Sequence, residues 1–299
     1  MQDFACGYVA VAGRPNVGKS TLTNKLLNFP LSIVTRKPQT TRQRTLGILT
    51  GEDYQVIFLD TPGMLVPRYA LQKVMLEAAW SAVEDADIVL LLTEPAADNF
   101  NGETRIIERL KSMRKKVVLA INKIDLVPKP SLLPLTEHFM AIFPFEEIVP
   151  VSALKNDGLD RLKQILISNL PRQAPFYPPD EVSDRPLRFF AAEIIRQKVF
   201  ELYGEEIPYS VAVVIDEYKE REKGKDYIRA NVIAEKDTQK AILIGGGGAA
   251  VKRLGQAARE SIERFVGKPV FLEIRVQVRK NWRKEERAAR RLQREEGWS

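Results

Sequence analysis

Eight consecutive residues near the N-terminus have the spacing of a phosphate-binding loop. They fit the pattern G-x-x-x-x-G-K-[ST] and run Gly13, Arg14, Pro15, Asn16, Val17, Gly18, Lys19, Ser20. Glycines in this pattern let several backbone N–H groups converge on one anion, and the following helix adds its partial positive charge. We expect all eight residues to bind a nucleotide, with Lys19 on the β- and γ-phosphates and Ser20 on Mg²⁺. The alternative is a glycine-rich turn that binds no ligand.

A second motif predicts the other side of the phosphate site. Asp60, Thr61, Pro62 and Gly63 follow the apolar run at 55–59. A carboxylate at the end of a buried strand, facing a phosphate loop, is where a Mg²⁺-holding aspartate belongs. The glycine lets the backbone come close to a γ-phosphate. We therefore predict that all four residues contact the nucleotide and that Asp60 shares the metal with Ser20.

A third motif indicates which base the nucleotide carries. Asn122, Lys123 and Asp125 follow the apolar run at 117–121. A buried Asp125 carboxylate accepts two donors side by side, which guanine offers through its ring N–H and exocyclic amine. Facing adenine, the same carboxylate would be left poorly paired. The motif thus favours GTP and GDP over ATP. Ser152 and Ala153, after another apolar run, are predicted to bring a backbone N–H to the guanine oxygen.

The ordered set GRPNVGKS, DTPG, NKID and SAL is typical of translation-factor-type GTPases. The segment Pro38-Gln39-Thr40-Thr41-Arg42-Gln43-Arg44 resembles the first switch of Era-type GTPases, bacterial ribosome-assembly GTPases with a C-terminal KH domain. The second half of the chain is similar as well, through Thr238-Gln239-Lys240, the four glycines at 245–248, and Val251-Lys252-Arg253-Leu254-Gly255. The resemblance covers nearly the whole chain.

The resemblance implies roles that the residues alone do not establish. Thr41, or less favourably Thr40, would bind Mg²⁺ and sense the γ-phosphate, so that Lys19, Thr41 and Gly63 form the catalytic set. Asn16 is similar to an asparagine that helps to hold K⁺ in related GTPases. Met64 stands where many GTPases place a water-orienting glutamine. Because methionine cannot hydrogen-bond water strongly, we expect slow intrinsic hydrolysis. The switches would span 31–47 and 63–80.

The elements that position these motifs follow from the hydrophobic pattern. Strands are expected at 6–12, 55–59, 87–92, 117–121 and 148–151, and helices at 69–84, 103–113 and 158–169. Such alternation predicts an α/β domain with a mostly parallel sheet and helices on both faces. A proline-rich stretch then interrupts the pattern, as expected of a stiff linker. We place a GTP-binding domain at 1–172, the linker at 173–186, a KH domain at 187–280 and a basic tail at 281–299.

The second domain is expected to be small and α+β. The pattern predicts a helix at 187–202, strands at 209–218 and 226–235, helices at 238–243 and 249–265, and a strand at 270–278. This order, with the resemblance, indicates a type II KH domain.

Glycines between two helices make the predicted RNA site. Gly245, Gly246, Gly247 and Gly248 fit G-x-x-G, a turn against which a nucleic-acid backbone can press. Lys252 and Arg253 follow one helical turn later and would meet phosphates. Arg279 and Lys280 open a strongly basic stretch and complete the predicted RNA-binding set. A flexible helix–helix turn is the alternative for the glycines. Trp282 would either stack on a base or pack against its own domain.

Composition sets outer limits. The net charge is +7, and residues 274–294 contain nine basic and two acidic side chains, which suits RNA, DNA or an anionic membrane. One cysteine, no apolar run of about 18 residues and no leader-like N-terminus lead us to expect a cytoplasmic protein, or one peripheral at the cytoplasmic face of the inner membrane.

The resemblance implies two partners, the single-stranded 3′ end of 16S ribosomal RNA and the 30S subunit. It also implies that this chain is a monomeric, nucleotide-controlled assembly factor that binds them. Three alternatives to this function stay open. They are an RNA-binding scaffold with a structural GTP-binding domain, a membrane-associated GTPase and, more distantly, a P-loop ATPase.

Overall fold

A computed structural model describes residues 4–35, 37–95 and 100–296. The chain divides into two units. The first unit contains the residues up to 66 together with 75–184, and the second contains 67–74 together with the residues from 185 onward. Residue 36, inside the predicted first switch, and the last three residues of the predicted basic tail lie outside the described residues. Within the described ranges, no helix is both long and apolar enough to cross a bilayer.

The described residues of the first unit form a six-stranded sheet in the order β2-β3-β1-β4-β5-β6. Only β2 runs antiparallel to its neighbour; the other pairs are parallel. The strands are β1 (Ala5–Gly13), β2 (Thr45–Thr50), β3 (Tyr54–Asp60), β4 (Ile88–Thr93), β5 (Lys116–Ile121) and β6 (Glu147–Pro150). The sequence predicts all of these except β2. The mostly parallel sheet of the expected fold class is confirmed.

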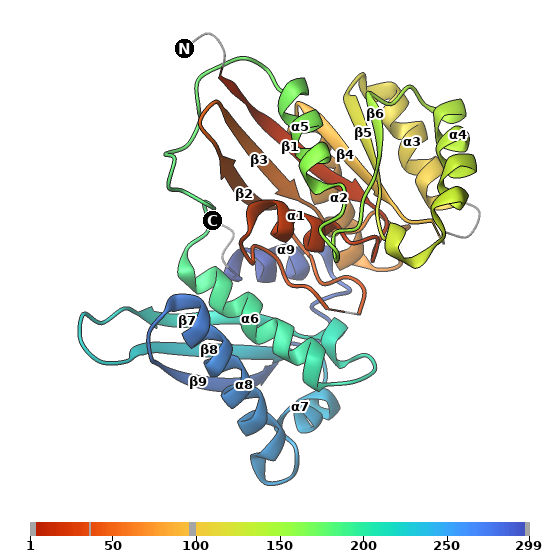
Figure 1. Cartoon of the computed structure of the whole chain (residues 1–299). Helices are drawn as coiled ribbons and strands as arrows, with labels where there is room; N and C mark the ends of the chain where they lie inside the picture. Colours follow the sequence, from red (N-terminus) through yellow and green to blue (C-terminus); the bar gives the residue numbers. More distant parts are fainter. Residues whose placement is uncertain (1–3, 36, 96–99, 297–299) are drawn as a thin grey trace. The chain divides into compact units, whose positions relative to one another are not determined.

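Helices cover both faces of this sheet (Figure 1). They are α1 (Lys19–Leu27), α2 (Ala70–Asp85), α3 (Asn101–Met113), α4 (Leu132–Ile142) and α5 (Leu159–Asn169). On one face Trp80, Ile107 and Phe139 pack against Leu91 and Leu119 of the central strands. The central strands read as unbroken apolar runs because both of their faces are buried. Their carboxyl ends meet at one edge of the sheet, and each predicted nucleotide motif follows such an end.

The proline-rich segment runs along the first unit and is hydrogen-bonded to it. Gln55, a wholly buried residue of β3, accepts the Phe176 and Tyr177 N–H groups at 2.8 and 3.0 Å. Further on, the Ile48 N–H donates to the Val182 carbonyl at 2.8 Å. The Ser183 hydroxyl donates to the Leu46 carbonyl at 2.6 Å. These contacts cover the free edge of β2.

The second unit has the predicted order of elements, which confirms the small α+β domain of the expected fold class. It contains α6 (Leu187–Leu202), β7 (Ala212–Lys219), β8 (Asp226–Ala234), α7 (Asp237–Ile244), α8 (Ala249–Val266) and β9 (Val270–Val278). The described strands form a sheet in the order β7-β8-β9, with β8 and β9 parallel. Ile195 and Val199 of α6 pack with Leu254 of α8 against Ile228 and Val232 of the sheet.

The basic C-terminal stretch contains a helix, α9 (Glu286–Glu295). Its Ala289 and Leu292 are buried, three residues apart on one side of the helix. The side chain of Glu296, just after α9, accepts the Val213 N–H of β7 at 3.1 Å. This helix is therefore part of the folded unit rather than an appendage to it.

Candidate functional site

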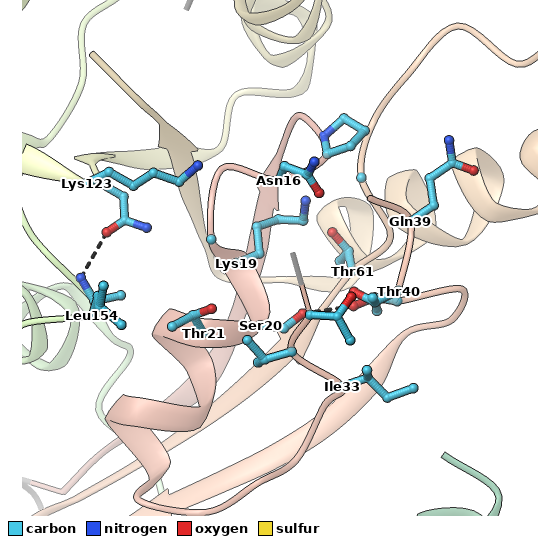
Figure 2. Close-up of a pocket in the computed structure, with 18 of the residues that line it drawn as sticks. Asn16, Lys19, Ser20, Thr21, Ile33, Gln39, Thr40, Thr61, Lys123 and Leu154 are labelled. Carbon is cyan, nitrogen blue, oxygen red and sulfur yellow. Dashed lines mark hydrogen bonds between the residues drawn. The ribbon is translucent and has the colours of Figure 1, made fainter. Parts of the chain in front are cut away.

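A cavity of about 560 Å³ opens where the nucleotide motifs meet (Figure 2). Its size is in the range of small-molecule sites. The predicted residues that line it are Pro15, Asn16, Gly18, Lys19, Ser20, Thr41, Thr61, Gly63, Asn122, Lys123, Asp125 and Ala153. Six other predicted residues do not line it: Gly13, Arg14, Val17, Asp60, Pro62 and Ser152. The structure thus brings the four motifs together around one space, with some members in supporting positions.

The Lys19 side chain lies at the centre of the phosphate loop. Its Nζ donates to the carbonyls of Gly13 and Arg14 at 3.1 and 2.9 Å. The residue is only 6% exposed, and burial lowers the pKa of its ammonium to about 8 even though the charge of nearby Asp60 acts to raise it. A buried ammonium held only by neutral carbonyls is well prepared to bind an anion.

Gly18 shows why the loop needs glycine. Its φ of +94° is in the left-handed region, and a Cβ there would come within 2.3 Å of the Asn122 amide nitrogen. That amide donates to the Val17 carbonyl at 2.8 Å. The first residue of the base motif therefore holds the phosphate loop from behind, a link that the linear sequence does not reveal.

Three oxygen-bearing side chains converge beside the loop and fit a magnesium ion. The Ser20 hydroxyl lies 2.8 Å from the Thr41 hydroxyl and donates to Asp60 Oδ2 at 2.9 Å. Asp60 is wholly buried, and its Oδ1 finds no hydrogen-bond partner among the described residues. Burial raises the pKa of this carboxyl, opposed first by the Ser32 hydroxyl and then by the Lys19 charge and the Ser20 and Thr41 hydroxyls. A hard cation takes such oxygen ligands and would satisfy the orphaned oxygen. Thr41, rather than Thr40, makes the contact with Ser20.

The base end of the cavity differs from the sequence expectation in two ways. Asp125 is exposed, not buried, and accepts the Ser152 hydroxyl at 2.5 Å. The prediction of burial is wrong for the chain by itself, because neighbouring side chains hold the carboxylate at the cavity mouth without covering it. Second, the Ala153 N–H, which was expected to be available for the guanine oxygen, already donates to Asn122 Oδ1 at 2.9 Å.

Two leucine side chains were not assigned a role from the sequence, although Leu154 was named as the last residue of the S-A-L motif. The side chains of Leu126 and Leu154 both line the cavity and are 68% and 69% exposed. Large apolar side chains at the mouth of a polar cavity suit the faces of a flat base. Their position in the sequence could have indicated this role, since each directly follows a residue predicted to contact the base.

Met64 takes no part in lining the cavity. Its side chain is 5% exposed and belongs to the main core of the first unit, while its N–H donates to the Gly13 carbonyl at 3.0 Å. A side chain buried in this way does not orient water at a γ-phosphate, which agrees with the expectation of slow hydrolysis.

The predicted glycine loop lies between α7 and α8 in the second unit. Gly247 and Gly248 have φ of +57° and +78°, which other residues adopt at a cost. Lys252 and Arg253, in the first turns of α8, are exposed. The Arg279 N–H donates to the Ala234 carbonyl at the end of β8 at 3.0 Å.

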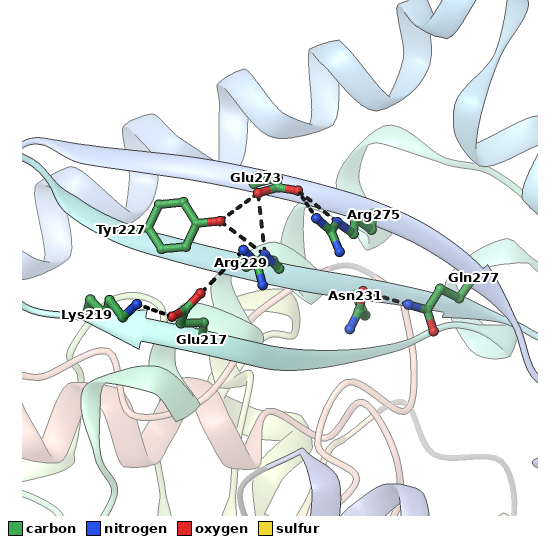
Figure 3. A network of polar contacts seen from close by, with 8 residues as sticks. All are labelled: Glu217, Lys219, Tyr227, Arg229, Asn231, Glu273, Arg275 and Gln277. Carbon is green, nitrogen blue, oxygen red and sulfur yellow. Dashed lines mark hydrogen bonds and ion pairs between the residues drawn. The ribbon is translucent and has the colours of Figure 1, made fainter.

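Much of the basic stretch is paired with carboxylates. Five of its nine cations form ion pairs: Arg275 with Glu273, Arg279 and Arg291 with Glu295, Arg283 with Glu235, and Arg290 with Glu286. The first of these belongs to a polar network that crosses the sheet from Lys219 to Arg275 (Figure 3). Trp282 is 3% exposed, which favours its packing role over base stacking.

Comparisons with known proteins agree with this geometry. A family described as 50S ribosome-binding GTPase matches residues 8–123, and a KH domain family matches residues 206–283. GTPase Era of Geotalea uraniireducens (strain Rf4) is 44% identical over 281 residues, covering 94% of this chain and 95% of the relative. A variant of Aquifex aeolicus Era bound to GDP·AlF4⁻ superposes with a TM-score of 0.91 at 38% identity, over 96% of this chain and 98% of that one. The structure of Era in complex with MgGDPNP and nucleotides 1506–1542 of 16S ribosomal RNA superposes with a TM-score of 0.92 at 39% identity. This match also covers 96% of this chain and 98% of that one.

Proposed function

Because this chain belongs to the Era family of GTPases, we propose that it is a nucleotide-controlled factor of 30S subunit assembly that binds the single-stranded 3′ end of 16S ribosomal RNA. Its reaction is hydrolysis of GTP to GDP and phosphate. The observation that carries the proposal is the single cavity that unites a phosphate loop, three magnesium-type ligands and a guanine-reading aspartate, in a chain that also has a KH domain.

In this proposal the phosphates lie over the loop at 13–20, where backbone amides and Lys19 bind them. The base enters between Leu126 and Leu154, with Asp125 accepting the two guanine donors. Ser20, Thr41 and Asp60 would hold Mg²⁺, which neutralises phosphate charge when it is bound. The Asp60 oxygen without a partner supports this assignment.

In hydrolysis the residues of this chain position the phosphates and stabilise their charge, and none of them is assigned as a general base. Lys19 stabilises the charge that develops on the transferred phosphoryl group. Thr41 closes the first switch over the γ-phosphate, and the Gly63 backbone approaches it from the second. Asn16, which lines the cavity, would hold a K⁺ ion near the same charge. A comparison of turnover in K⁺ and Na⁺ buffers tests that last assignment.

The RNA-binding part rests on the second unit. The exposed Lys252 and Arg253 follow a turn of four glycines, which allows a nucleic-acid backbone to come close. Arg279 and Lys280 lie at the end of β9 and would extend the contact to further phosphates. The relative solved with 16S ribosomal RNA is similar over nearly this whole chain, which supports the same class of RNA here.

The proposal is tested by RNA crosslinking in cells and by binding to the 16S 3′ end in vitro. The binding measurement in vitro is carried out with GDP and with a non-hydrolysable GTP analogue. We expect guanine nucleotides to outcompete ATP, and RNA affinity to differ between the two nucleotide states, since γ-phosphate contacts order switch segments. Equal RNA affinity in both states would contradict nucleotide control, and loss of guanine preference would contradict the whole proposal.

The alternatives give different results in the same preparation. A scaffold with a structural GTP-binding domain would bind GTP but release no phosphate in a single-turnover assay. The cations of 274–294 would also attract anionic lipid, so a membrane-associated protein would sediment with anionic vesicles even when the RNA is present. We propose a cytoplasmic monomer, for which RNA removes the protein from the vesicles and light scattering gives one chain.

A further inference from the structure

An ion pair between a half-buried arginine and a buried glutamate lies directly behind the phosphate loop. Arg14 is the second residue of the loop, and its carbonyl accepts the Lys19 ammonium at 2.9 Å. Its side chain does not line the cavity. Instead, its guanidinium donates to Glu103 Oε2 of α3 at 3.3 Å. The loop residue that touches the catalytic lysine is therefore tied to a different element.

Glu103 is built into the core of the site. Its side chain is 0% exposed, and its second oxygen accepts the Thr93 hydroxyl at 3.1 Å. A carboxylate this deeply buried is costly unless it is paired and hydrogen-bonded. The neighbouring Gly102 leaves room for the pair, because a Cβ there would come within 2.6 Å of Arg14 Cδ.

The contacts continue until they return to the phosphate loop. Thr93 ends β4, and its carbonyl accepts the Asn122 N–H at 2.8 Å. The Asn122 side chain then donates to the Val17 carbonyl at 2.8 Å. The loop is thus held from behind at residues 14 and 17, and Pro15 and Asn16 between them line the cavity.

We propose that Glu103, acting through Arg14, is a positioning residue of the nucleotide site. This role rests on the proposed GTP-binding function. The pair fixes the loop amides in the arrangement that phosphates require, and Arg14 neutralises the buried Glu103 carboxylate, whose charge would otherwise act on phosphates bound by the same loop. Glu103 without Arg14 opposes nucleotide binding, whereas a neutral side chain of the same shape does not.

The test compares four full-length proteins: wild type, Arg14→Ala, Glu103→Gln, and the double variant. The dissociation constants of GMP, GDP and a non-hydrolysable GTP analogue are measured in magnesium buffer. We expect Arg14→Ala to weaken the GTP analogue by about 10–100-fold and Glu103→Gln by less than about fivefold. Adding Glu103→Gln to Arg14→Ala is expected to recover most of the loss. Arg161→Ala, which breaks the exposed pair with Glu147, is the matched control and should leave affinity unchanged.

A merely structural role gives a different pattern. If the pair only stabilised the fold, Arg14→Ala would lower the unfolding temperature while weakening all three nucleotides equally or not at all. The positioning role predicts a loss that grows from GMP to GDP to the triphosphate, because the uncompensated charge repels each added phosphate. A double variant as weak as Arg14→Ala would overturn the proposal. If wild type itself ignores guanine nucleotides, the proposed function fails, and this role with it; unchanged variants beside a binding wild type overturn this role alone.

Discussion

Lys19 illustrates how one residue is tuned by its burial. The hydrogen bonds to two carbonyls hold the ammonium in place, but burial lowers its pKa to about 8, so the free protein is close to losing this charge in mildly alkaline buffer. A bound phosphate stabilises the charged form and raises the pKa again.

The affinity for GDP should therefore depend on pH. The pKa in the free protein is below the pKa in the complex, so binding is unaffected below about 8 and takes up a proton above it. We expect the dissociation constant to rise up to about tenfold per pH unit above that point. Calorimetry in two buffers of different ionisation enthalpy measures the proton. Lys19→Arg stays charged throughout and should flatten the profile up to about pH 9; a wild-type profile that is flat over the same range would contradict the assignment.

Asp125 should decide which purine is accepted. Asp125→Asn replaces an acceptor of two hydrogen bonds by an amide that also donates. We expect GDP affinity to fall by about 100-fold or more, and xanthosine diphosphate, which has a carbonyl in place of the exocyclic amine, to bind better than GDP. Competition against a fluorescent nucleotide gives both constants. Asp157→Asn, a change of the same kind outside the cavity lining, is the control.

Among individual residues, the sequence predicted those whose role depends on the shape of the local backbone. Lys19, Ser20 and Asp60 occur in short motifs that carry their own geometry, and the structure brings them together. Leu126, Glu103 and the side-chain role of Leu154 were not found, because their roles depend on what other elements place against them. A leucine or a glutamate in a helix or turn has no distinguishing pattern of its own.

Among the elements, the strands and helices with strong periodicity were predicted and the weakly patterned ones were not. The strand β2 was missed because Thr45–Thr50 is short, contains glycine and lies at the sheet edge, where its neighbours rather than its own residues hold it. The helix α9 was hidden by its charged composition, although Ala289 and Leu292 have helical spacing.

Gln55 should control the attachment of the proline-rich segment. Gln55→Leu keeps the volume but leaves the Phe176 and Tyr177 N–H groups without their acceptor, and we expect a loss of about 1–3 kcal/mol in local stability. Hydrogen–deuterium exchange of residues 172–184 should accelerate accordingly. Thr50→Val removes a single acceptor of the Gln55 amide and is the milder control. Equal exchange in Gln55→Leu and wild type would show that the segment is held by other contacts.

The glycine loop allows a test that leaves the fold intact. No described atom lies within 4 Å of the position that a Cβ would take at Gly246, so Gly246→Asp should not lower the unfolding temperature. Its charge would repel an RNA backbone, and we expect affinity for single-stranded RNA to fall by about tenfold at low salt. Gly204→Asp is equally unobstructed and is the control. If both variants bind RNA alike, the glycine loop is not the RNA site.

For the whole molecule, the nine cations of 274–294 overstate the charge available to a polyanion, because at least five of them are paired with carboxylates. Charge counting along the sequence predicted the basic stretch, but it could not find a partner such as Glu235, which is distant in the chain and directly follows β8. The order of the two domains could be predicted because each has its own motif.

Glu295 offers a way to change that balance. Glu295→Gln releases Arg279 and Arg291 and raises the net charge from +7 to +8. We expect RNA affinity to rise about threefold at low salt, with a log–log salt dependence steeper by about 0.7 for each additional phosphate contacted. Glu222→Gln gives the same net charge in an exposed loop and is the matched control. An equal effect of both variants would mean that total charge, and not Arg279, is what matters.

The segment at 171–184 also decides where this protein can be cut. Since the Ile48 N–H and the Leu46 carbonyl of β2 are engaged by Val182 and Ser183, a fragment that stops at 172 would leave an outer strand with unpaired backbone groups, ready to join its counterpart in another molecule. A fragment that continues to 184 keeps that strand shielded. The solubility of the isolated nucleotide-binding half should therefore depend on residues 173–184.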